Sequence, residues 1–584
     1  MRSLLLSLCC CLAAGAQNPG YIGAQAAEQP QQPPGSLSGS VVDAVTGEPV
    51  RGASVQLLHY GRGGMSNLKV DGAGQFSAAD LQPGQYAVQV NHQAYPGPLG
   101  VTPAAVMVQV ESGKATTGVV IKLPPGGTIS GRILSDDGEP LMNCTLSLTT
   151  VPLGGLPVRQ GGFGQTNDEG EFRIASIAPD RYLLWTRCGE ALPVERLLDR
   201  TGPEGLDPGA GWRPSFYPDS PTRSGATSIA VVSGANIELE LSMKATPVTT
   251  VRGVVVTPAG AAAPEVYRVL LEPEDTATGR NLSLEHSVQG KSGRFRITMV
   301  PPGTYRVRAI PLGQRSQPAW YGSRTITVGT TPPPPIRLQM EPAIRISGRV
   351  EDPRTEEGAT ARPAPRMRIG SFADLPAPES PKGSISFTEI DTRQQSQEIR
   401  NAQVKAADGT FEVEGLTPGR WRVEYRSFRG PAWIESMQYG EAPNDGQSIE
   451  VAQGGASPLL IQLGGKSAEL RYELKGAGVA SKTTWAIQAI RADGPATMGV
   501  NVIGSIVRGQ PMLGQPLAPG RYYIFAVEAM LGGSLVNDRV NQLLLRELKV
   551  VEVAAGREQT IEVPCFTQEE IRQKIAAFLA DDVR

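Results

Sequence analysis

Short stretches of this chain alternate between hydrophobic and polar or small residues. The run from Tyr86 through Val88 to Val90 alternates in this way, and so does the run from Tyr305 to Ala309. A period of two places every second side chain on one face, so each run predicts a strand with one buried face. Helical spacing is almost absent before residue 565. The pattern therefore predicts an all-β protein.

One arrangement of aromatic and turn residues occurs in four complete copies and part of a fifth. In each copy a hydrophobe follows the first aromatic by five positions, and a second aromatic follows it by ten. The turn between them reads Pro-Gly, except for Pro179-Asp180 in the second copy. Proline presets φ and glycine accepts positive φ, so we expect the two aromatics to bracket a hairpin and fill one core. The copies run from Phe76 to Tyr86, Phe172 to Tyr182, Phe295 to Tyr305 and Phe411 to Trp421, and the fifth keeps only Leu517 to Tyr522.

Further strands before and after each copy complete a unit of about 100–120 residues. Short strands with frequent Gly and Pro turns are typical of antiparallel sandwiches, and the 584 residues include 68 glycines and 49 prolines. We therefore predict a tandem array of five Ig-like or transthyretin-like antiparallel β-sandwiches. The predicted boundaries are a signal peptide at 1–16, a disordered linker at 17–36, sandwiches at 37–124, 125–246, 247–342, 343–466 (with an insertion) and 467–564, and a helix at 565–584.

The C-terminal segment differs from the repeats. Thr567 to Glu570 form a capping box, and Ile571, Ile575, Phe578 and Leu579 follow at helical spacing. One amphipathic helix of three to four turns is predicted, which docks on the last unit.

The N-terminus has the features of a cleaved export signal. A positive Arg2, an apolar core from Leu4 to Leu12 and Ala14-Gly15-Ala16 predict cleavage before Gln17. The apolar run is too short to span a bilayer, and no later stretch approaches the ~20 residues needed. We expect a periplasmic, cell-surface or secreted protein without a transmembrane segment. The net charge of −2, with no basic block, makes nucleic acid an unfavourable partner.

The first unit resembles the carboxypeptidase regulatory-like domain. The resemblance rests on Gly39-x-Val-x-Asp43, Thr46-Gly47-Glu48-Pro49-Val50-x-Gly52-Ala53-x-Val55, Gly74-x-Phe76 and Leu81-x-Pro83-Gly84-x-Tyr86. It implies a transthyretin-like sandwich related to starch-binding-like and collagen-adhesin B-type folds. These motifs are turn and core chemistry, so they imply no activity.

Catalytic chemistry finds no support in the sequence. A zinc carboxypeptidase needs His and Glu ligands, whereas His59, His92 and His286 have no Glu or second His at ligand spacing. Neither a G-x-S-x-G elbow nor a P-loop occurs. We expect no catalytic residue, no metal and no cofactor.

Three cysteines remain after the signal. Cys144 and Cys188 fall in the second unit, and alternation points both side chains inward. In an exported protein these cysteines either form a disulfide or remain as two buried free thiols, and the sequence does not decide between the two states. Cys565 is left over.

Aromatic residues outside the copies are the recurrent feature that could bind something. They are expected in loops before the last strands of units two, three and four: Trp212, Phe216, Tyr217, Trp320, Tyr321, Trp433 and Tyr439. They either cap the open end of each core or stack on sugar rings, and capping is favoured because such anchors commonly pack inward.

Three hypotheses of function follow. The first is a non-enzymatic exported spacer, adhesive or ligand-binding scaffold of the cell envelope. The second is a carbohydrate-binding protein that uses the loop aromatics, and the third is an enzyme with a site between units. The partner is a polysaccharide or a surface or envelope protein, and the sequence leaves the oligomeric state open.

Overall fold

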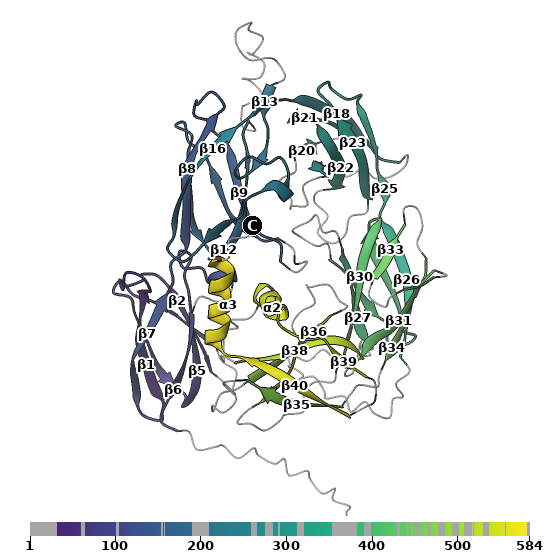
Figure 1. Ribbon diagram of the computed structural model, residues 1–584. Coiled ribbons are helices and arrows are strands. Elements are labelled where there is room, and N and C mark those ends of the chain that lie inside the picture. Colours follow the sequence, from purple (N-terminus) through teal and green to yellow (C-terminus); the bar gives the residue numbers. More distant parts are fainter. Residues whose placement is uncertain are drawn as a thin grey trace, which may run out of the picture.

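The computed structural model arranges β-sheets in five groups around a closed ring (Figure 1). It describes residues 32–59, 65–100, 104–153, 156, 158–189, 210–258, 266–274, 284–289, 293–311, 320–352, 382–390, 399–428, 432–440, 442–444, 448–452, 457–464, 469–476, 485–492, 501–506, 517, 519–528, 537–554, 556 and 558–580. The predicted signal peptide, most of the predicted linker and the predicted insertion lie outside these residues. The predicted all-β class is confirmed.

Unit 1 packs a three-stranded sheet on a four-stranded one. The three strands are β4 (Gln75–Leu81), β1 (Gly35–Asp43) and β7 (Ala115–Leu123). The four are β3 (Met65–Lys69), β2 (Ser54–His59), β5 (Gly84–Asn91) and β6 (Ala104–Val110). Phe76 from the first sheet and Tyr86 from the second meet in one hydrophobic core.

Units 2, 3 and 4 repeat this plan with added strands. Unit 2 has β11 (Glu171–Ile177), β8 (Gly127–Ser135) and β16 (Asn236–Met243) against β10 (Gln160–Gln165), β9 (Thr145–Thr150), β12 (Asp180–Arg187), β14 (Ser215–Phe216) and β15 (Ile229–Val231). Unit 3 has β21 (Arg294–Val300), β18 (Thr249–Val256) and β24 (Ile336–Gln339) against β20 (Leu284–Gln289), β19 (Val266–Pro273), β22 (Gly303–Pro311) and β23 (Trp320–Val328). Unit 4 has β29 (Thr410–Leu416), β26 (Ile344–Glu351), β34 (Leu459–Gly464), β31 (Trp433–Tyr439) and β32 (Ala442–Asn444) against β28 (Ile399–Val404), β27 (Gly383–Glu389), β30 (Gly419–Ser427) and β33 (Ser448–Val451).

Unit 5 joins its strands into one continuous sheet. The order is β35 (Glu469–Lys475), β40 (Glu558–Phe566), β38 (Gly520–Glu528), β36 (Trp485–Arg491) and β37 (Asn501–Ile506), and β39 (Val551–Val553) also pairs with β38. The continuity arises because β40 pairs in parallel with both β35 and β38. Each of the five units has its own core, while the boundaries given above remain predictions.

Two features of the pairing differ from the prediction of antiparallel hairpins. The first and last long strands of units 1 to 4 pair in parallel, as β1 does with β7. The strand before the Pro-Gly turn and the strand after it lie in different sheets, since β4 pairs with β1 whereas β5 pairs with β2. The expected hairpin is therefore wrong. The chain crosses between the sheets, so the two aromatics reach one core from opposite sides.

A hydrogen bond from the second aromatic secures this crossing. The Tyr86 hydroxyl donates to the carbonyl of Gln82, four residues earlier, at 2.9 Å. The equivalent bonds of Tyr182, Tyr305 and Trp421 reach Ala178, Pro301 and Thr417 at 2.8 Å each. A buried Tyr or Trp needs a partner for its polar atom, and the turn supplies one in each of these units.

The predicted C-terminal helix is confirmed as α3 (Gln568–Ala580). The Thr567 hydroxyl accepts the Glu570 N–H at 3.2 Å, and the Glu570 carboxylate accepts the Thr567 N–H at 2.7 Å, which is the predicted capping box. Ile571 and Ile575 are buried against unit 5. A second helix, α2 (Asp538–Leu545), was not predicted.

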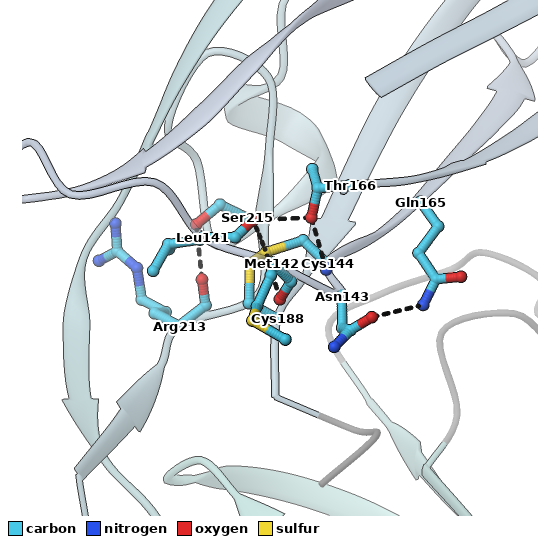
Figure 2. Close-up of a disulfide and its surroundings, with 9 residues drawn as sticks. All are labelled: Leu141, Met142, Asn143, Cys144, Gln165, Thr166, Cys188, Arg213 and Ser215. Atoms are coloured by element: carbon cyan, nitrogen blue, oxygen red, sulfur yellow. Dashed lines mark hydrogen bonds between the residues drawn. A yellow bond between two sulfur atoms is a disulfide. The ribbon is translucent and has the colours of Figure 1, made fainter. Parts of the chain in front are cut away.

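Cys144 and Cys188 form a disulfide in unit 2 (Figure 2). The disulfide joins the start of β9 to the end of β12. Beside it, the Thr166 hydroxyl accepts the Cys144 N–H at 2.9 Å and donates to the Leu141 carbonyl at 2.7 Å. Cys565 is a buried free thiol, and burial raises its pKa to about 11.

Loss of the disulfide is expected to loosen unit 2. The two cysteines are 44 residues apart, and closing a loop of this size restricts the unfolded chain, so Cys144→Ala with Cys188→Ala should lower the free energy of unfolding by about 2–4 kcal/mol. Denaturant unfolding of the oxidised parent and the variant measures the difference. Dithiothreitol should shift the parent and leave the variant unchanged, and an unshifted parent contradicts the prediction.

Candidate functional site

The seven candidate aromatics lie mostly in strands, so the expectation that they occupy loops is wrong. Trp212 ends β13 (Ala210–Trp212) and Phe216 ends β14. Trp320 and Tyr321 begin β23, and Trp433 and Tyr439 are the two ends of β31. Tyr217, directly after β14, is the exception, but its N–H still donates to the Leu184 carbonyl at 2.9 Å. Their backbones pair with neighbouring strands, which the sequence pattern around them does not reveal.

Each of the three tryptophans stands opposite the end of its unit. Trp212 pairs with Ala245 in β17 (Ala245–Pro247), the segment that leads from unit 2 to unit 3. Trp320 pairs with Pro342 in β25 (Glu341–Pro342), which leads from unit 3 to unit 4. Trp433 pairs with Gly464, the last residue of unit 4 described. These aromatics therefore hold the segments that connect consecutive units.

The side chains of this set are buried or half-buried. Phe216 is 1% exposed and packs with Leu183 and Trp185. Four others are half-buried on the cores of their own units: Trp212, Tyr217, Trp320 and Tyr439. The Trp433 ring lies so close to Gly464 that a Cβ there would clash with its Nε1. Packing against cores and connecting segments is the role these contacts support, and sugar binding stays a prediction.

Polar contacts fix two of these aromatics further. The Tyr321 hydroxyl donates to the Glu341 carboxylate at 2.7 Å, and burial together with this bond raises the pKa of Tyr321. Next to Trp212, Asp219 accepts hydrogen bonds from Arg213, at 2.8 Å, and from Lys244. Burial raises the pKa of Asp219, but these two cations lower it more, so it lies below its ordinary value. The Arg213 segment lies beside the disulfide in Figure 2.

Trp320→Ala is expected to weaken the junction between units 3 and 4. The substitution removes a half-buried ring from the core of unit 3, so the free energy of unfolding should fall by about 1–3 kcal/mol. Denaturant unfolding followed by circular dichroism measures the change. Phe163→Ala, at a ring 56% exposed, is the control and should change stability by less than about 0.5 kcal/mol. Equal effects of the two variants would contradict the structural role.

A second kind of junction closes the ring. Helix α3 of unit 5 lies beside units 1 and 2 in Figure 1. Helices α2 and α3 share a hydrophobic cluster with one residue of unit 1, Leu99, and one of unit 2, Leu153. We call this cluster, with the polar contacts around it, the closing junction. Its remaining buried members are Ile490, Phe525, Val527, Val540, Leu543, Leu544, Phe566, Ile571, Ile575 and Leu579.

Leu99 connects three units at once. It lies in the short 3-10 helix Pro98–Gly100 after β5 and is 1% exposed. Its N–H donates to the Pro179 carbonyl of unit 2 at 2.8 Å. Its own carbonyl accepts the side-chain amide of Asn537, the residue that caps α2, also at 2.8 Å.

A buried ion pair lies at the centre of the closing junction. Arg539 of α2 donates from Nη2 to Asp180 Oδ1 at 2.7 Å and from Nη1 to the Val151 carbonyl at 2.9 Å. The two charged side chains are only 2% and 3% exposed. Burial raises the pKa of Asp180, and the Arg539 guanidinium opposes that rise. Beside the pair, Arg181 donates to the Leu579 carbonyl at the end of α3 at 3.4 Å.

The sequence carries one signal for this site, a departure from the repeat at the turn of the second copy. Asp180 occupies the turn position where the other copies have Gly84, Gly303, Gly419 and Gly520. Gly84, Gly419 and Gly520 have φ of 153°, 141° and 151°, whereas Asp180 is not among the residues with positive φ. A charged residue at a glycine position of a repeat indicates a specific contact. Its partner, Arg539, lies 359 positions away and has no sequence signal.

The described part of the chain contains no cluster of side chains that could hold a metal ion. There, no three His, Cys, Asp or Glu side chains come together as metal ligands would. The helices among those residues are all too short or too polar to cross a membrane.

Comparison with known proteins places one part of the chain. A comparison with curated proteins finds no match. Among solved structures, the Bacillus anthracis TIE protein is 12% identical, with coverage of 53% of this chain and 51% of that chain and a TM-score of 0.16. The minor pilin GBS52 of Streptococcus agalactiae is 13% identical, with coverage of 39% and 99% and a TM-score of 0.20. BcpA, the major pilin subunit of Bacillus cereus, is 11% identical, with coverage of 53% and 99% and a TM-score of 0.14.

These structural likenesses carry no argument about function or arrangement, because the TM-scores are low. The chain spans about half the length of the TIE protein. The family comparison is specific: residues 36–124 match the model of the carboxypeptidase regulatory-like domain. This match confirms the resemblance that the glycine, proline and aromatic pattern of the first unit predicted.

Proposed function

We propose that the protein is an exported, non-enzymatic scaffold of the cell envelope, built as a rigid closed frame. The observation that carries the proposal is the closing junction, in which the buried Asp180–Arg539 pair attaches unit 5 to unit 2 and Leu99 attaches it to unit 1. A spacer needs only flexible or extended connections between its domains. A chain that also joins its last unit to its first two is better suited to hold surfaces at fixed relative positions.

The connections between consecutive units support the same function. Trp212, Trp320 and Trp433 pair with the segments that end units 2, 3 and 4. Interfaces between domains usually permit relative motion unless they are extensive and apolar, and the closing junction combines apolar contact with a buried ion pair. Such a frame would present its connecting loops to an envelope protein or polysaccharide at constant spacing.

Small-angle X-ray scattering of residues 17–584 tests the frame. Five units with radii of gyration of about 13 Å each give about 30 Å as a closed ring and about 45–50 Å as an end-to-end row. The scaffold proposal expects the smaller value over a range of salt concentrations. A value near that of the row would show a flexible or extended array and support the spacer instead.

Cell fractionation tests export. The full chain should reach the envelope or medium with an N-terminus at Gln17, and a chain that lacks residues 1–16 should stay in the cytoplasm. Mass spectrometry of the N-terminal peptide identifies the cleavage point. An uncleaved cytoplasmic protein would remove export from the proposal.

Carbohydrate binding is the second candidate function. It is favoured by Trp212, Trp320 and Trp433, which are half-buried rather than fully buried at comparable places in three units. A bound glycan should quench tryptophan fluorescence. Trp433→Ala should weaken binding by about 1–2 kcal/mol, because the loss of one aromatic contact costs binding free energy of this size. If the folded parent binds nothing on a glycan array and its fluorescence does not change, carbohydrate binding is rejected. The protein-binding scaffold is then the remaining function.

A further inference from the structure

We propose that two copies of this chain can exchange their C-terminal units, so that unit 5 of each copy occupies the closing junction of the other. The inference concerns assembly and goes beyond the scaffold proposal, since it holds whether or not the protein is exported. It identifies the surface formed by Leu99, Val151, Leu153 and Asp180 as an interaction surface whose partner is a second copy of the same chain.

The donor half of the junction is complete within unit 5. Helix α3 packs Ile571 and Ile575 in the same cluster as Phe525 and Val527, which belong to strand β38 of its own unit. The first N–H of the helix, at Gln568, donates to Glu528 of that strand at 3.0 Å. Unit 5 therefore holds its helices in place by itself, and it can present them to any matching surface.

The acceptor half is complete within units 1 and 2. The Leu99 N–H donates to Pro179 at 2.8 Å, and the Gly126 N–H donates to Ala94 at 3.0 Å. Asp180 accepts the N–H of Arg181 at 2.7 Å, which orients its carboxylate independently of unit 5. The bonds that hold the acceptor surface together therefore do not involve unit 5.

Among the described residues, every contact between unit 5 and units 1 and 2 is non-covalent. The contacts are hydrophobic packing, one ion pair, and hydrogen bonds whose partners are 359 to 438 positions apart. Closure within one copy is favoured only by the effective concentration that units 3 and 4 impose. When the ring opens at high protein concentration, the same contacts form between copies.

The buried charges select the reciprocal dimer. A one-way contact would leave one Asp180 and one Arg539 without their partner, and each is 3% exposed or less in the closed junction. A reciprocal exchange satisfies both pairs with two chains and closes by symmetry, as exchanged elements in dimers commonly do. The exchanged form is therefore a dimer of defined composition.

Charge reversal at two positions tests the proposal. Asp180→Arg places two guanidinium groups in the junction, and Arg539→Asp places two carboxylates there, so neither variant should close its own ring. In an equimolar mixture, each variant supplies the charge that the other lacks. Size-exclusion chromatography with light scattering is expected to give twice the mass of one chain for the mixture and the mass of one chain for each variant alone. The double variant Asp180→Arg/Arg539→Asp restores opposite charges within one copy and should remain a single chain.

A mixture that keeps the mass of one chain, with both variants folded by circular dichroism, overturns the proposal. If either variant fails to fold, the parent protein provides the test. The chain is incubated in mild denaturant, returned to buffer and studied by sedimentation. Its dimer fraction should rise as the protein concentration is raised from about 1 µM to about 1 mM, since the upper value approaches the effective concentrations typical of linked domains. Crosslinking of a mixture of ¹⁵N-labelled and unlabelled chains should then join unit 5 of one isotope to unit 2 of the other. A parent that stays a single chain throughout this range also overturns the proposal.

Discussion

Asp180→Ala is expected to open the ring and to lower the free energy of unfolding of the body formed by units 1, 2 and 5 by about 3–5 kcal/mol, because removal of one partner leaves a buried charge unpaired. Arg539 is 2% exposed and donates to both Asp180 and Val151, so it cannot reach water without moving α2. The radius of gyration should rise with the loss of stability. Denaturant unfolding and small-angle scattering of the same sample measure the two effects.

Two further variants separate the ion pair from general damage. Glu171→Ala breaks the exposed pair of Glu171 with Arg132 in the same unit, where both side chains are about half exposed, and should cost about 0–1 kcal/mol. Asp180→Leu combined with Arg539→Met removes both charges and should recover much of the lost stability, since apolar replacements of a buried pair are often neutral. A loss below about 1 kcal/mol for Asp180→Ala would show that the junction does not depend on the pair.

Trp421→Ala is expected to unfold unit 4 selectively, with a loss of about 3–5 kcal/mol from the removal of a large buried ring. Trp421 is fully buried in a core that holds Phe387, Phe411 and Ile461. Its Nε1 donates to the Thr417 carbonyl at 2.8 Å, so the variant also leaves that acceptor without its partner. Because the described residues of unit 4 do not contribute to the closing junction, its transition should separate from that of the joined units in calorimetry.

Phe428→Ala is the matched control for unit 4. The Phe428 ring is 52% exposed, so its loss should change stability by less than about 0.5 kcal/mol. If Trp421→Ala lowered every transition equally, the five cores would unfold as one and the independence of unit 4 would be disproved.

The closing junction reduces the number of independent unfolding units below the number of cores. Five copies, each with its own core, suggest five separate unfolding units. The closing junction places residues of units 1, 2 and 5 in one hydrophobic cluster, so these three should share a transition. No described residue of units 3 and 4 belongs to that cluster.

The sequence by itself determined the local structure of this protein. Alternation identified the strands, and the spacing of Phe76 and Tyr86 identified two residues of one core. The capping box from Thr567 to Glu570 marked the start of α3. Each of these features depends on residues within about ten positions, where backbone geometry and side-chain direction follow directly from residue type.

The tertiary structure alone decided how these elements combine. Turn residues show that the chain reverses at Pro83, but not that β4 and β5 enter different sheets, because both outcomes bury the same alternate residues. The sequence identifies Trp212, Trp320 and Trp433 as recurrent aromatics, but it does not identify the strands with which they pair. Asp180 and Arg539 are 359 positions apart, and a single ion pair has no periodicity to reveal it. Closing a ring depends on the summed geometry of every unit and connection between the ends, which no local pattern encodes.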